Sequence, residues 1–230
     1  TNPLYTAREM KHQFRDSGAK AIVILANSAH LLEEILSETQ IETVVVTEVG
    51  DLLGFPKSFI INSAVKYVKK MVPAYNLPKS YTFHQAMDLG ADASFQPEKC
   101  SPTDIAFLQY TGGTTGVSKG AMLTHGNIVA NVMQMLEWMK PKLIESEETA
   151  ILALPLYHIF SLTVNALGLF SLGATNLMVT NPRDIPGFIK ILRQNFFSVF
   201  PGLNTLYNAL MNHPDFDKVD WSQLKVGVAG

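Results

Sequence analysis

A run of glycine and hydroxyl-bearing residues follows a predicted strand, Ile105–Gln109. This run constrains the possible folds of the chain more than any other feature. Residues 111–120 contain four glycines, three threonines, one serine and Lys119. Glycines let the backbone approach a ligand closely, and consecutive amides and hydroxyls can donate to phosphate oxygens. Lysine adds a positive point charge. The spacing is neither G-x-x-x-x-G-K-[ST] nor G-x-G-x-x-G. The run therefore predicts a polyphosphate-binding loop, with a tight polar turn that holds no ligand as the alternative.

Helical and extended segments alternate at short spacing near the start of the chain. Thr6 and Glu9 have the spacing of a capping box, which predicts a helix start, and Gly18 is expected to end that helix. Such alternation is typical of parallel α/β units and predicts an α/β fold. The next predicted elements are the strand Ala21–Leu25, the helix Ala29–Leu36 and the strand Thr43–Val46.

Residues 149–182 contain no Asp, Glu, Lys or Arg. A long uncharged apolar stretch can indicate a membrane span. Pro155 and Gly173 interrupt this one, and no Lys/Arg cluster flanks it closely. Strands of parallel sheets are buried on both faces and lack alternation, so we interpret the stretch as buried α/β elements. These are the strand Ala150–Leu154, the helix Phe160–Ser171 and the strand Ala174–Val179, with a further strand at Phe196–Phe200.

The polar segment Met139–Glu148 is the best candidate boundary between subdomains. We expect a first α/β subdomain over residues 1–140, ending with the glycine-rich loop and the helix that follows it. A second α/β subdomain is expected over residues 149–230. The chain starts without Met and ends in a strand that runs into a glycine turn, so we expect both ends to be cut from a longer chain.

The segment Phe55–Tyr81 carries five lysines and no acidic residue, and its apolar residues recur at helical spacing. One interpretation is an amphipathic helix that packs on its own domain with a solvated basic face. The other is a surface that docks on anionic lipid, where a substrate of low solubility would be found. The sequence leaves both open.

Composition excludes several classes of protein. The chain is 47% hydrophobic and 17% charged, which predicts a sizeable core and argues against disorder. A net charge of -2 gives no indication of a nucleic-acid partner. The single cysteine, Cys100, cannot form an internal disulfide, which favours a reducing, cytoplasmic setting. His12, His30, His84 and His213 show no metal-ligand spacing, so no metal site is expected within this chain.

Residues 111–120 resemble the phosphate loop of the adenylate-forming enzymes, a superfamily of acyl-CoA synthetases, luciferases and adenylation domains of peptide synthetases. Other motifs extend the resemblance over essentially the whole chain, toward the bacterial long-chain fatty acid–CoA ligases. Ser118 stands where many relatives have Pro or Ala. The motifs are Asn2–Thr6, Leu108–Tyr110, Lys119–His125, Leu154–Phe160, Asn181–Pro186 and Gly202–Leu210.

The resemblance implies a fold and a reaction. The fold would be two stacked, mostly parallel sheets flanked by helices, as in the family's large N-terminal domain. The reaction would use ATP, Mg²⁺ and CoA: a fatty acid carboxylate attacks ATP to give acyl-adenylate and pyrophosphate, and CoA then displaces AMP. The family's acidic Mg²⁺ residue and its catalytic lysine would lie outside this chain, so the fragment alone is expected to be inactive.

The resemblance also implies roles for single residues. His158 would lie near the reacting carboxylate; the alternative is a buried histidine satisfied by a backbone carbonyl. Gly202 would open the acyl pocket; the alternative is a turn after Pro201. Ala229 and Gly230 would lead into the adenine-contacting turn. His125 and Asn127 are expected to support a helix start. The residues expected at the β- and γ-phosphates of ATP are Thr111, Gly112, Gly113, Thr114, Thr115, Gly116 and Lys119.

The sequence leaves two other functions open. Another adenylate-forming ligase, acting on aryl or amino acids, would share the loop and differ in its carboxylate. A nucleotide- or acyl-binding module without catalysis would also keep the loop. The expected partners are fatty acid, ATP and CoA, with an anionic membrane surface as a further candidate on the cytoplasmic side.

Overall fold

The computed structural model describes residues 1–111 and 118–230. They form two compact units, one of Thr1–Lys99 with Leu108–Ala121 and one of Cys100–Phe107 with Met122–Gly230. The helix after the loop therefore groups with the second unit, whereas the sequence placed it before the boundary. The division into functional subdomains at 1–140 and 149–230 stays a prediction.

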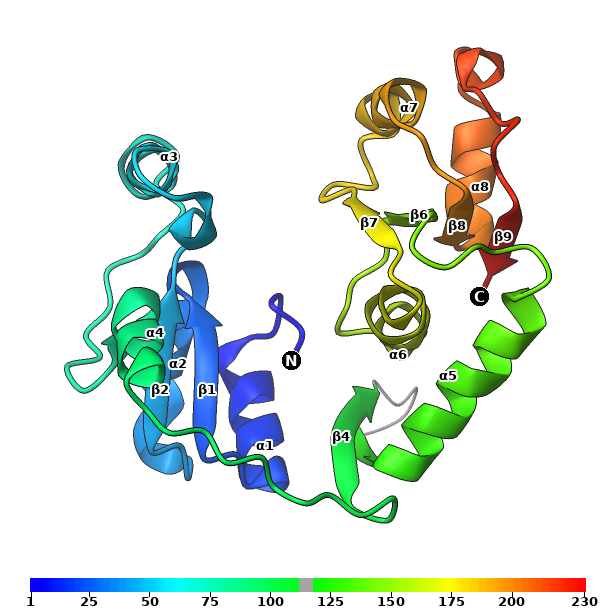
Figure 1. Ribbon diagram of the computed structural model, residues 1–230. Coiled ribbons are helices and arrows are strands. Elements are labelled where there is room, and N and C mark those ends of the chain that lie inside the picture. Colours follow the sequence, from blue (N-terminus) through cyan, green and yellow to red (C-terminus); the bar gives the residue numbers. More distant parts are fainter. Residues whose placement is uncertain (112–117) are drawn as a thin grey trace. The chain divides into compact units, whose positions relative to one another are not determined.

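The first unit is built on a parallel sheet in the order β1-β2-β3. Helix α1 (Ala7–Ser17) starts at the predicted Thr6 capping box and ends at Gly18, whose φ of 63° is left-handed. Residues from α1, α2 and strands β1 and β2 form one core. Figure 1 shows these elements in blue. The elements are β1 (Ala21–Leu25), α2 (Ala29–Ile35), β2 (Thr43–Thr47), β3 (Tyr81–Thr82) and α4 (Phe83–Ala91).

The basic amphipathic segment is helical, as α3 (Lys57–Ser63) followed by a π-helical turn at Ala64–Val68. Polar bonds hold it, since Asn62 accepts from the Gly50 amide at 2.7 Å and donates to Asp51 at 3.0 Å. Most of its apolar side chains are exposed in the part of the chain that the structure describes. The exposed fractions are 59% for Ile60, 79% for Val68 and 54% for Met71.

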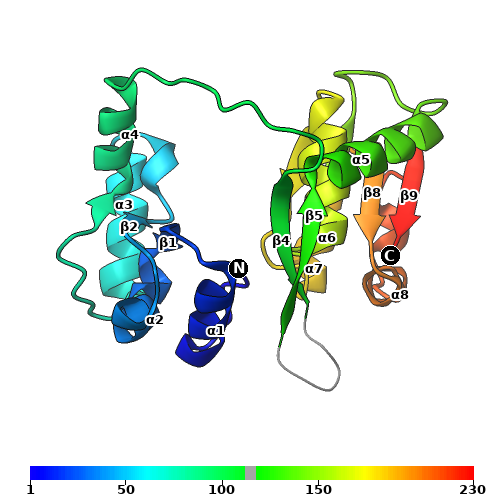
Figure 2. The same ribbon diagram turned by 90° about the horizontal axis from the view of Figure 1, so that it is seen from below.

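Strands β4 (Ile105–Thr111) and β5 (Lys119–Thr124) form a separate two-stranded sheet, which the sequence did not predict as such (Figure 2). Helix α5 (His125–Met139) follows, and Thr124 and Asn127 form a reciprocal capping box at its start. This confirms the expected support by Asn127, while His125 is the first helical residue. In the second unit, Met139 of α5 is buried and Met135 packs against the core that contains Val164 and Leu169 of the π-helical segment.

The second unit contains a four-stranded parallel sheet in the order β7-β6-β8-β9. Ile151 and Phe200 pack on one face with helices α7 and α8, and Ala150 and Val199 pack on the other with residues of the π-helical segment and α5. The strands are β6 (Thr149–Leu152), β7 (Thr175–Met178), β8 (Val199–Gly202) and β9 (Val226–Ala229), and the helices are α6 (Ile159–Ser161), the π-helical Leu162–Leu169, α7 (Ile185–Gln194) and α8 (Asn204–Met211).

The α/β class with parallel sheets and flanking helices is confirmed, and the uncharged stretch does form buried α/β elements. Among residues 1–111 and 118–230, no helix has the length and apolar character needed to cross a bilayer. The predicted end of the strand at Phe200 was wrong. Pro201 and Gly202 are part of β8, paired with Val228 and Ala229, instead of forming a turn after an earlier strand.

A buried charge cluster joins the starts of three strands in this sheet. Glu148, fully buried, accepts from the Lys225 ammonium at 2.7 Å, the Ile144 amide at 2.6 Å and the Ser198 hydroxyl. Burial alone would raise the pKa of Glu148, but Lys225, Ser198 and the Ile144 amide together hold it below the ordinary value of 4.5. The carboxylate is therefore ionised and fully paired.

We predict that Glu148→Gln in the full-length protein lowers the free energy of unfolding by about 3 kcal/mol, because it breaks a buried ion pair. The depressed pKa means that this stabilisation is complete above pH 4.5 and is lost as the pH falls through the folded-state value. Urea titrations at neutral and acidic pH measure both effects, and the difference between variant and wild type should shrink in acid.

The matched control is Glu137→Gln. Its pair with Lys140 is solvent-exposed, so its removal should change stability by less than about 1 kcal/mol. Equal effects of the two substitutions at neutral pH would contradict a special role for the buried cluster.

Candidate active site

The base of the glycine-rich loop is held together by residues on either side of it. Strand β4 ends at Thr111 and β5 begins at Lys119. The Ser118 hydroxyl donates to the Thr111 carbonyl at 2.9 Å, which joins the two ends. Lys119 is exposed at the start of β5. Gly112, Gly113, Thr114, Thr115 and Gly116 lie outside the described residues, so their phosphate contacts stay a prediction.

Residues that the sequence did not single out also contact this base. The Tyr110 hydroxyl donates to Asp16 of α1 at 2.5 Å, and His12 of α1 bonds the Ser118 carbonyl at 2.8 Å. These pairs are 94 and 106 residues apart along the chain, so no local pattern could have indicated them. Burial first, and then the bond to Asp16, raises the pKa of Tyr110 to about 12, so the hydroxyl keeps its proton at neutral pH.

His158 lies on the surface, in the turn between β6 and α6. Its Nδ1 accepts from the Phe160 amide at 3.3 Å, which caps the helix that begins at Ile159. The alternative of a buried histidine satisfied by a carbonyl is therefore wrong. Because Nδ1 accepts, the proton of the neutral ring is on Nε2. An exposed imidazole with an available Nε2–H can donate to a carboxylate or phosphate oxygen.

Gly202, Ala229 and Gly230 meet at the carboxyl ends of β8 and β9. Gly202 pairs with Ala229, and the Gly230 amide donates to the Gly202 carbonyl at 3.2 Å. A Cβ on Gly230 would lie 3.1 Å from the ring of Phe160, which follows His158 by two residues. In open parallel sheets, ligands bind outside the carboxyl ends of the strands. The structure thus brings Gly202, Ala229 and Gly230 together at one such edge, with the Phe160 ring beside them.

Tyr207 of α8 connects the two strands, β8 and β9, that form this edge. Its hydroxyl donates to the Phe200 carbonyl at 2.5 Å and lies 3.0 Å from that of Val228, so it bridges β8 and β9. Burial raises the pKa of Tyr207 to about 12. The ring lies against Gly202, where a Cβ would come within 2.8 Å of it. Gly202 is therefore required by a close contact inside the strand, and the turn interpretation does not hold.

Within the described parts of the chain, no three His, Cys, Asp or Glu side chains gather closely enough to hold a metal ion. The residues near the loop base and near His158 include no carboxylate cluster suited to Mg²⁺, which prefers oxygen ligands in octahedral geometry. These residues therefore do not fit a Mg²⁺ site.

We predict that Gly202→Ala in the full-length protein lowers the free energy of unfolding by about 1–3 kcal/mol, because Tyr207 is held by two carbonyls and cannot yield to the new methyl group. The control is Gly227→Ala in β9, where an added Cβ meets nothing within 4 Å. That change should be neutral or slightly stabilising. Thermal or urea unfolding measures both, and equal losses would contradict the close-contact explanation.

Known proteins resemble this chain over its whole length. The long-chain-fatty-acid–CoA ligase of Haemophilus influenzae is 50% identical over 231 residues, which cover 100% of this chain and 41% of that protein. The protein of the same name from Escherichia coli O6:H1 is 48% identical, again over 100% of this chain and 41% of the relative. The chain thus spans about two fifths of the length of these curated relatives.

A solved structure shares the fold. The crystal structure of ATP-bound MatB from Rhodopseudomonas palustris matches with a TM-score of 0.72 and 20% identity, over 100% of this chain and 39% of that one. The family model described as "AMP-binding enzyme" matches residues 1–230. With a match that covers every residue, this chain belongs to the AMP-binding enzyme family.

Proposed function

We propose that this chain is the part of a long-chain fatty acid–CoA ligase that carries the phosphate loop and one side of the acyl pocket. The observation that carries the proposal is the 50% identity to a curated ligase of that name across the whole chain. In the whole protein, a fatty acid oxygen would bond to the α-phosphorus of ATP as pyrophosphate leaves. The thiol of CoA would then attack the acyl carbon, with AMP as the leaving group.

At the phosphate end, we assign binding of the ATP β- and γ-phosphates to the loop that begins at Thr111 and to Lys119. Support comes from the exposure of Lys119 and from the bond that joins Ser118 to Thr111. Phosphoryl chemistry of this kind depends on positioning and on neutralising charge. A lysine at the start of a strand, next to a hydrogen-bonded loop base, suits that task. The ligands of Mg²⁺, which would offset the negative charge of the same phosphates, are expected outside these residues.

At the carboxylate end, we assign His158 a contact with the reacting acid. Its Nε2–H could donate to the carboxylate and thereby orient one oxygen toward phosphorus, without acting as a base. Gly202 would present only its backbone to the acyl chain, with the Tyr207 ring filling the space that a Cβ would need. Ala229 and Gly230 would lead to the adenine. Their common location at the carboxyl ends of β8 and β9 supports these assignments.

The test is carboxylate-dependent exchange between ATP and pyrophosphate by the full-length protein. The panel runs from acetate through octanoate to palmitate, with benzoate and several amino acids. We expect strong exchange with palmitate and little with acetate or amino acids. Exchange with aryl or amino acids would favour another adenylate-forming ligase. A folded protein that exchanges with none of them would favour a binding module without catalysis.

A variant within the same assay separates the two roles of His158. His158→Asn keeps an acceptor for the Phe160 amide, since Asn is a good cap, and removes the imidazole. We expect exchange to fall by about tenfold or more while the melting temperature stays at the wild-type value. Wild-type exchange in His158→Asn would leave the residue with capping as its only role.

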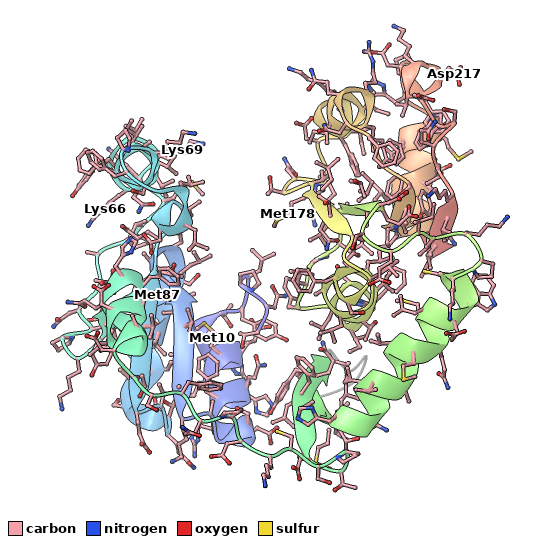
Figure 3. The ribbon with its side chains drawn as sticks, in the orientation of Figure 1. Met10, Lys66, Lys69, Met87, Met178 and Asp217 are labelled. Atoms are coloured by element: carbon pink, nitrogen blue, oxygen red, sulfur yellow. The ribbon has the colours of Figure 1, made fainter. Side chains whose placement is uncertain are left out.

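We also propose that the full-length protein acts in the cytoplasm and docks on anionic membrane through the α3 surface, defined as α3 and the π-helical turn at Ala64–Val68. Apolar side chains of this surface are exposed, and Lys66, Lys69 and Lys70 are exposed beside them. Figure 3 shows Lys66 and Lys69 extending from this helix. Exposed apolar groups next to lysines suit a membrane surface with acidic headgroups.

We predict that charge reversal by Lys66→Glu with Lys69→Glu weakens binding of the full-length protein to anionic vesicles by about tenfold or more, since each lysine contributes about 1 kcal/mol near such a surface. Co-sedimentation with anionic and neutral vesicles measures it. The control, Lys142→Glu with Lys190→Glu, makes the same change of net charge on exposed positions of the second unit. Equal binding of the wild type to neutral and anionic vesicles would contradict the proposal.

A further inference from the structure

Two polar side chains on one face of α1 reach the two segments that flank the glycine-rich loop. His12 and Asp16 are four residues apart, so they lie one turn apart on the same side of the helix. Asp16 accepts from the Tyr110 hydroxyl, just before the loop, at 2.5 Å. His12 contacts the Ser118 carbonyl, just after the loop, at 2.8 Å. One helix turn thus contacts both ends of the loop.

The chemistry of each contact is defined. A backbone carbonyl can only accept, so the His12 ring must carry its proton on Nε2 to donate to Ser118. Tyr110, with its raised pKa of about 12, donates to the Asp16 carboxylate. A bond from a neutral hydroxyl to a carboxylate is charge-assisted and stronger than one between neutral groups. Both contacts are therefore suited to holding a fixed geometry.

Helix α1, which provides these contacts, is held by its caps and by its packing on the core. It is capped at both ends, by Thr6 and by Gly18. Met10 and Phe14 are each 4% exposed and pack into the core of the first sheet. The helix is thus fixed on one side by the core and presents His12 and Asp16 on another.

The residues between the two contacts are closely packed as well. A Cβ on Gly120 would lie 3.0 Å from the Tyr110 ring, so the ring rests on the backbone of β5 next to Lys119. The Ser118 hydroxyl donates to the Thr111 carbonyl. Tyr110, Thr111, Ser118 and Gly120 are thereby joined to one another and to α1. The backbone of Lys119 lies within this set.

We infer that His12 and Asp16 are positioning residues, which hold the two ends of the phosphate loop and the backbone of Lys119 in the arrangement that receives the phosphates of ATP. The inference rests on the proposed function for the identity of the ligand. Contacts that are already formed before a ligand arrives reduce the ordering cost of binding it. Without the two bonds, the ends of the loop would have to be ordered by ATP itself.

The experiment compares full-length variants by ATP affinity in equilibrium binding without carboxylate, by the KM values for ATP and palmitate in exchange, and by melting temperature. We expect His12→Ala and Asp16→Ala each to weaken ATP binding and raise the KM for ATP by about tenfold, since small misplacements have large effects on such sites. The KM for palmitate should not change. His12→Gln, which keeps a donor, and Asp16→Asn, which keeps an acceptor, should restore most of the affinity for ATP.

Ser17→Ala is the matched control on the same helix, because its hydroxyl bonds only the Phe14 carbonyl within α1. It should bind ATP as the wild type does. Unchanged ATP affinity in both alanine variants would overturn the inference. So would a loss of ATP binding that follows the melting temperature and is not restored by His12→Gln, since that indicates packing alone.

The same data distinguish a failure of the proposed function. A wild type that binds ATP but exchanges with no carboxylate would end the ligase proposal, while the ATP affinities of the variants would still decide the role of His12 and Asp16. A folded wild type that does not bind ATP would overturn this inference directly.

Discussion

The bonds of the buried Glu148 carboxylate set the arrangement of strands in the second unit. Glu148, Ser198 and Lys225 each stand one residue before a strand, β6, β8 and β9 respectively. Backbone bonds continue the connection, from Ser198 to Thr149 and from Lys225 to Ser198. The starts of three parallel strands are thus fixed relative to one another. Because strand lengths are similar, the same cluster also sets where the carboxyl ends with Gly202 and Gly230 come to lie.

Much of the fold was predictable because local rules and tertiary structure agree. Strand Ala21–Leu25 and the helix that begins at Ala29 lie where the pattern of apolar residues placed them. The capping box at Thr6 is present. Strand β8 shows where local rules fail. Pro201 is a turn signal, yet it lies in a strand, because the pairing of β8 with β6 is at Val199 and Pro201 pairs only with Val228 of β9. A proline is tolerated where one side of the strand lacks a partner.

In the candidate site too, some residues could be predicted from the sequence and others could not. Residues with a recognisable motif, such as Lys119 and His158, could be named from the sequence, and so could the glycines that meet at the edge of β8 and β9. The sequence could not show that His158 is an exposed cap, because burial depends on how the turn after β6 leaves the sheet. Tyr207, His12 and Asp16 could not be found at all, since each acts through a partner far along the chain.

The long separation between His12 and Ser118 has a consequence for the order of events during synthesis. At about 5–20 residues per second, a ribosome needs about 5–20 s to add the 106 residues between them. Helix α1 and the first sheet can form in that interval, because their core uses only residues up to Leu77. The end of the first unit to which we assign phosphate binding cannot form until β4 and β5 have emerged. The nascent chain would therefore fold its first sheet without any help from nucleotide, and ATP could stabilise only a later intermediate.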